Sequence, residues 1–147
     1  MFIDNDPKDN VYKDLIDLAF EVCDTFILVV RESIFFNQNA DYLLEELESS
    51  LKEVKEQYEW PGIISAGGKP AKIYYYNTDI NARTIIKTVT NSLHSWVQPD
   101  LPEDLSFIKN GESWLINVSH EFESCIITEN KEEIDKITQI KGLNVRL

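Results

Sequence analysis

Residues 105–119 read LSFIKNGESWLINVS and carry the clearest structural signal in the chain. Asn110 and Gly111 separate two short runs that are rich in apolar residues. Both residues tolerate the positive φ angles that a tight turn between antiparallel strands requires. The stretch therefore predicts a β-hairpin, and residues 124–128 predict a third strand that completes a meander.

Hydrophobic periodicity predicts the other elements. Residues 25–31 are apolar at alternate positions on both faces, which predicts a strand covered on both sides. Residues 41–59 repeat leucine at helical spacing among Glu and Lys, which predicts a long amphipathic helix ended by Pro61. The expected elements are helices at 11–23, 41–59, 79–97 and 130–140 and strands at 25–31, 71–76, 105–109, 113–119 and 124–128.

Helices and strands follow one another along the 147 residues without an internal repeat or a linker. The apolar fraction of 43% is sufficient for one hydrophobic core. No apolar run approaches the roughly 18 residues that would indicate a membrane span. We therefore expect a single α+β domain over residues 1–147, with a mainly antiparallel sheet of about five strands packed by about four helices.

The net charge of -12 argues against direct binding to nucleic acid, because affinity for duplexes comes mostly from cationic side chains. The first residues include Asp4 and Asp6 where an export signal would carry basic residues, so we expect a cytoplasmic protein. Cys23 and Cys125 lie in apolar surroundings, which predicts two buried thiols rather than a disulfide.

Each motif that resembles a phosphate-binding or metal-binding site lacks a residue or a spacing that such a site requires. Residues 62–69 approach a phosphate-binding loop, but Pro70 follows Lys69 where a Ser or Thr is needed. Two His and two Cys without close spacing predict no zinc site, and residues 100–104 lack the oxygen spacing of a calcium loop. We therefore expect neither a cofactor nor a metal.

Ser119, His120 and Glu121 contain the residue types of a catalytic triad, but neighbours in a strand point to opposite faces. Alternation from Trp114 places His120 on the apolar side of its strand, where we expect a structural role. The alternative is a small hydrolase-like enzyme in which a nearby acid orients His120. His94 shares its side of a helix with polar residues, and we expect it to be solvated.

Acidic residues are unevenly distributed along the chain. Residues 1–59 contain 15 acids and 5 bases, and residues 100–104 form a proline-flanked turn with three acids that we expect to be exposed. Such a surface would attract a basic protein and accelerate association. The expected partner-binding residues are the acids Glu45, Glu46, Glu48, Glu53, Asp100, Glu103 and Asp104 and the aromatic anchors Trp60 and Tyr74.

The segment WVQPDLPEDLSF at residues 96–107, followed by Trp114-Leu115 and Ser119-His120-Glu121, resembles a block in small uncharacterised bacterial proteins. Size, acidity and α+β composition are also loosely similar to bacterial toxin-immunity proteins. That similarity implies a non-enzymatic protein that binds and neutralises a basic toxin, for example a nuclease. A second alternative is a structural or regulatory subunit that pairs with another copy through its aromatic residues.

Overall fold

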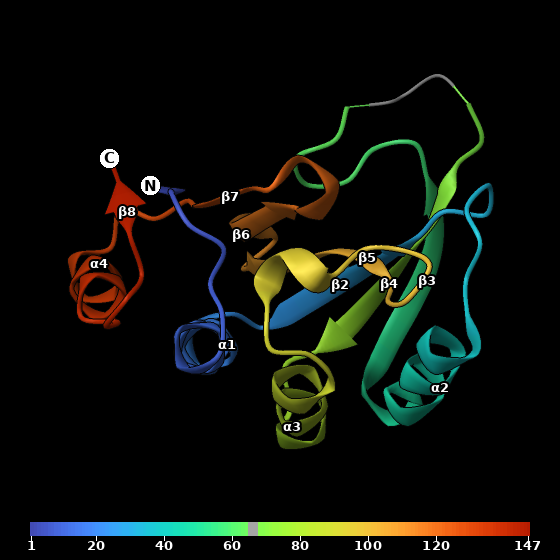
Figure 1. Ribbon diagram of the computed structural model, residues 1–147, viewed down its shortest axis with the longest axis horizontal. Coiled ribbons are helices and arrows are strands. Elements are labelled where there is room, and N and C mark those ends of the chain that lie inside the picture. Colours follow the sequence, from blue (N-terminus) through green and yellow to red (C-terminus); the bar gives the residue numbers. More distant parts are fainter. Residues whose placement is uncertain (65–67) are drawn as a thin grey trace.

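The computed structural model describes residues 1–64 and 68–147, which form one antiparallel sheet with helices α1, α2 and α3 along one side (Figure 1). The sheet has eight strands in the order β3-β4-β2-β5-β6-β7-β1-β8. The strands are β1 Phe2–Ile3, β2 Thr25–Val30, β3 Leu51–Gln57, β4 Ala71–Asn77, β5 Glu103–Lys109, β6 Glu112–Val118, β7 Glu123–Ile126 and β8 Val145–Arg146. The helices are α1 Asn10–Val22, α2 Gln38–Glu46, α3 Ile80–Val89 and α4 Lys131–Thr138. The predicted α+β single-domain class is confirmed, with eight strands instead of about five.

The predicted hairpin and meander are confirmed. β5 pairs with β6, and β6 pairs with β7, both antiparallel. The turn residues Asn110 and Gly111 have φ angles of 51° and 82°, as the Asn-Gly signal requires. The strand expected at 124–128 ends earlier, at Ile126, because Ile127 and Thr128 lead into the loop before α4.

β2 lies between β4 and β5 and is buried on both faces, as its apolar sequence predicts. Phe26 and Leu28 belong to the large hydrophobic core on the helix side of the sheet. Ile27 and Val29 belong to a smaller cluster on the opposite face, against which Trp60 packs. The segment that follows β3, residues 58–64, passes over this second face of the sheet (Figure 1).

Gly62 brings that connection into contact with the sheet. A Cβ at this position would lie 2.5 Å from Val118 Cγ2 and 3.0 Å from Ile116 Cγ2 on β6. Its φ of +85° is also a conformation that side chains other than glycine rarely adopt. Glycine therefore allows the chain to approach β6 closely at this point, two residues after Trp60, which packs on the same face of the sheet.

The helix predicted at 41–59 is wrong in its second half. α2 ends at Glu46, a 3₁₀ turn follows at η1 (Glu48–Ser50), and residues 51–57 form the edge strand β3. β3 is exposed on both faces from Lys52 to Glu56, so no buried face gives it the alternating pattern of a strand. Pairing with β4 decides its conformation.

The helix predicted at 79–97 starts correctly, with Asp79 as its N-cap, but ends at Val89. Thr90 is extended, and residues 93–95 form a separate 3₁₀ turn, η2 (Leu93–Ser95). The closing helix is confirmed as α4, and the Asn130 side chain caps it by accepting a hydrogen bond from the backbone N–H of Glu133. In the described parts of the chain, no helix is long and apolar enough to cross a membrane.

Candidate functional site

The largest group of the predicted acids lies on α2, η1 and β3, which we call the acidic edge. Glu45, Glu46, Glu48 and Glu53 are all exposed, as expected. Residues 38–59 contain seven acids and only two lysines. Lys52 donates a hydrogen bond to Thr25, and Lys55 lies 3.3 Å from Glu53. The acidic edge therefore keeps a net negative charge at the end of the sheet.

β3 also has an unused hydrogen-bonding edge. It is the first strand in the sheet order and pairs only with β4, so no described strand covers its outer side. α2 lies at the same corner of the molecule (Figure 1). Three apolar or aromatic side chains are exposed beside the acids, namely Tyr42 at 50%, Val54 at 44% and Tyr58 at 53%. The sequence did not predict these three residues as exposed, because all of them lie within the segment 41–59 that was expected to form one amphipathic helix.

The predicted aromatic anchors are half-buried instead. Tyr74 packs against the main core and stacks on Tyr76 with ring centroids 6.3 Å apart. Trp60 covers the smaller cluster, and its ring lies 5.0 Å from the Arg31 guanidinium carbon. Both aromatic rings therefore stabilise the fold, and neither stands out from the surface.

The exposed turn predicted at residues 100–104 is wrong for two of its three acids. Asp100 is exposed and accepts a hydrogen bond from Asn37 at 2.7 Å. Glu103 and Asp104 are 3% and 0% exposed, because β5 begins at Glu103 and carries both residues into the molecule. These two carboxylates interact internally and do not belong to the anionic surface.

Glu103 and Asp104 are each held by different partners. Arg31 Nε lies 2.7 Å from Glu103 Oε2 as an ion pair, without the alignment of a hydrogen bond. Asp104 accepts two hydrogen bonds, from Trp60 Nε1 at 3.0 Å and from the Ser119 backbone N–H at 3.0 Å. Burial raises the pKa of both carboxyl groups, and the neighbouring donors and Arg31 only partly offset it.

His120 does not lie on the apolar side of a strand, so that prediction is wrong. β6 ends at Val118, and Ser119–Glu121 form the 3₁₀ turn η3, which leaves the His120 side chain 41% exposed. The Ser119 hydroxyl accepts from Asn117 at 2.9 Å and lies 3.4 Å from the Leu93 carbonyl, so it is not aligned with His120 as a triad. The turn instead brings His120 close to Glu103 and Asp104.

His94 is buried, contrary to the expectation of a solvated residue. It is 7% exposed and lies edge-on to Phe122 with ring centroids 5.7 Å apart. Burial lowers its pKa, although Asp6, 3.6 Å away, acts in the opposite direction. η2 turns His94 inward, which a continuous helix through this segment would not have done.

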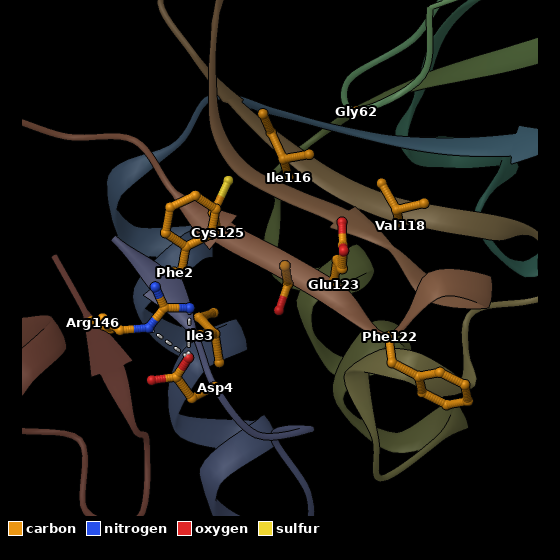
Figure 2. Close-up of a pocket in the computed structure, with 11 residues that line it drawn as sticks. Phe2, Ile3, Asp4, Gly62, Ile116, Val118, Phe122, Glu123, Cys125 and Arg146 are labelled. Atoms are coloured by element: carbon orange, nitrogen blue, oxygen red, sulfur yellow. Dashed lines mark hydrogen bonds and ion pairs between the residues drawn. The ribbon is translucent and has the colours of Figure 1, made fainter.

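A groove of about 520 Å³ opens on the face of β6 and β7 that the helices do not cover (Figure 2). Ile116, Val118 and Cys125 form its apolar floor, and Gly62 lies at one side. At the other side Arg146 is paired with Asp4 at 3.1 Å. Because this arginine is already neutralised, the groove offers an apolar surface without an unpaired cation.

Both cysteines are free thiols, as predicted. Cys23 is buried and Cys125 is half-buried. Burial raises the pKa of both thiols, so neither is an activated nucleophile. Part of the rejected phosphate-loop segment, residues 65–67, lies outside the described residues.

Comparison of the chain with family models, with curated proteins and with solved structures gives no significant match. The acidic edge and the cluster around Glu103 are therefore the features of the molecule that bear on its function.

Proposed function

We propose that the protein is a non-enzymatic, cytoplasmic binding protein of the immunity type, which neutralises a basic toxin domain through its acidic edge. One observation carries this proposal: the exposed acids of α2 and η1 lie at the start of an edge strand whose outer hydrogen-bonding side no described strand occupies. An edge strand accepts an extended segment of a partner by backbone pairing. The flanking acids select a partner of positive charge.

The exposed groups of the acidic edge suit a protein interface. Tyr42 and Tyr58 supply aromatic surface with few rotatable bonds, the type of side chain that contributes most to binding energy. Glu45, Glu46 and Glu48 lie on the same helix and turn as Tyr42 and are free of the internal contacts that occupy Glu103 and Asp104. We accordingly assign the contact surface to α2, η1 and β3 and remove Glu103 and Asp104 from it.

The first step of the experiment is to look, in the open reading frame next to the gene for this chain, for a large secreted protein with a basic C-terminal domain. The chain is co-expressed with the basic C-terminal domain of an adjacent secreted protein, and association is measured at low and high salt. In the test variant Glu45, Glu46, Glu48 and Glu53 are all changed to Gln. We expect the association rate at low salt to fall by at least about tenfold and its salt dependence to flatten.

The matched control removes the same number of charges elsewhere, at Glu112, Glu121, Glu123 and Glu129, all of which are exposed. Its association rate should stay within about twofold of that of the unmodified protein, because these acids lie outside the acidic edge. Equal losses in both variants would show that only net charge matters. Absence of any complex, or of protection in cells, would contradict the immunity function itself.

A further inference from the structure

Glu103, Asp104 and His120 meet where the start of β5 approaches η3. One ligand atom from each residue lies within 4.8 Å of the other two. Two of the ligands are buried carboxylates, and the third is an imidazole that remains open to solvent. His120 and the adjacent pair Glu103 and Asp104 thus converge on one point from two separate elements, with an exposed side through which a small ion can enter.

The charges at this point are not balanced by the protein. Two carboxylates are buried, and one of them, Glu103, forms an ion pair with Arg31 at 2.7 Å. Asp104 receives only neutral donors, from Trp60 and the Ser119 backbone. A buried carboxylate without a cation or a proton is costly, so one negative charge at this point is left to be neutralised.

The hydrogen bonds around Asp104 leave room for a metal ion. Trp60 and the Ser119 backbone each donate to a different oxygen of this carboxylate. A carboxylate oxygen accepts in more than one direction, so each oxygen keeps a free lone pair. Donors of this kind orient carboxylate ligands in known metal centres, and Trp60 and Ser119 would hold Asp104 in the same way.

We propose that Glu103, Asp104 and His120 bind a single divalent metal ion of the zinc type, with water completing the coordination. A nitrogen ligand beside two carboxylates favours Zn²⁺ over Mg²⁺ and Ca²⁺, which prefer oxygen ligands alone. Metal–ligand distances of about 2.0–2.2 Å place tetrahedral ligand atoms roughly 3.4 Å apart. Rotation of the exposed His120 side chain would bring its ring nitrogen closer to the carboxylate oxygens of Glu103 and Asp104, which now lie within 4.8 Å of it. The bound ion would link β5 to η3.

This inference is independent of the proposed partner. The test titrates ZnCl₂ into the tag-free, chelator-treated full chain and measures heat and tryptophan fluorescence. We expect one ion per chain and a fluorescence change that is lost in Trp60→Phe, because Trp60 bonds directly to a ligand. Affinity should fall with decreasing pH, because protons compete for the ligands. MgCl₂ should bind at least about tenfold more weakly.

The deciding variant is His120→Asn, which changes an exposed side chain and should leave the fold intact. It should weaken zinc binding by more than about tenfold. The control is Glu129→Gln, which removes an exposed acid outside the cluster. Binding that is absent, that is unchanged in His120→Asn, or that falls equally in Glu129→Gln would overturn the proposal.

Discussion

Replacing Gly62 with alanine should destabilise the protein much more than the same change at Gly111. Both glycines have nearly the same φ, +85° and +82°. Gly111 has open space where a Cβ would lie, whereas a Cβ at Gly62 would lie 2.5 Å from Val118 Cγ2. The two variants therefore share the backbone cost and differ in the steric contact with the sheet.

The magnitudes follow from these two contributions. A left-handed backbone costs a residue with a Cβ about 1–2 kcal/mol, partly offset by about 0.4–1 kcal/mol from the lower entropy of the unfolded chain. Gly111→Ala should thus cost about 1 kcal/mol. Overpacking adds about 1–3 kcal/mol at Gly62. The total of about 3 kcal/mol corresponds to a fall in Tm of about 6–12 °C for a chain of this size.

Urea unfolding followed by tryptophan fluorescence measures both variants. The m-values should agree, because neither change alters the surface exposed on unfolding, and the midpoints should differ. If Gly62→Ala and Gly111→Ala lose the same free energy within about 0.5 kcal/mol, residues 58–64 do not lie on β6 as described. In that case the position of Trp60 beside Asp104 would also be in doubt.

Three further changes test the buried polar groups. Tyr12→Phe should cost about 1–3 kcal/mol in urea unfolding, because the indole N–H of Trp96 loses its acceptor in the core. Glu103→Gln should gain stability relative to the unmodified protein as pH rises from 4 to 7, because a raised folded-state pKa means that ionisation opposes folding. Glu133→Gln should show the opposite trend in pH-dependent unfolding. Burial acts to raise the pKa of Glu133, but the donors around it, Lys109 first among them, outweigh burial, and the pKa is lowered in the folded state. The ionised Glu133 therefore stabilises the fold, and this stabilisation is lost as pH falls. A reversed slope in either variant would refute the corresponding assignment.

The hairpin and the central strand could be predicted from the sequence because their signals are local. Asn110 and Gly111 determine a turn by their own conformational preferences, whatever surrounds them. β2 is covered on both faces, and its residues are therefore apolar at successive positions, a pattern that a short stretch of sequence shows directly. The starts of α3 and α4 are local in the same way, because the side chains of Asp79 and Asn130 cap the first turn of the helix that follows them.

β3 could not be predicted because its conformation is decided by a distant strand. Its residues include Glu, Lys and Leu, which have good helix propensity, and its exposed faces carry no alternation. Backbone pairing with β4 supplies the stabilisation that propensity does not. The helical spacing of apolar residues in α2 continues into residues 51–57. The predicted helix therefore included a segment that forms a strand in the structure.

The cluster of Glu103, Asp104 and His120 was hidden for a related reason. The expectation of an exposed acidic turn depended on Pro99 and Pro102, which indicate where a helix stops but not where a strand begins. β5 starts two residues earlier than expected, and its position next to β2 brings Arg31 to Glu103. The acidic residues of one short segment thus divide into exposed and buried members.

Negative charge has opposite consequences on the acidic edge and in the buried cluster around Glu103. On the acidic edge, water screens the carboxylates of Glu45 and Glu53, so they cost little and act over a distance on an approaching partner. The exposed charged side chains of β3, Lys52, Glu53, Lys55 and Glu56, also protect an open strand edge from pairing with a second copy of the chain. Around Glu103 burial removes that screening, and the charge must be neutralised where it lies. The acidic edge is therefore suited to selecting a basic protein, and the buried cluster to holding a small cation.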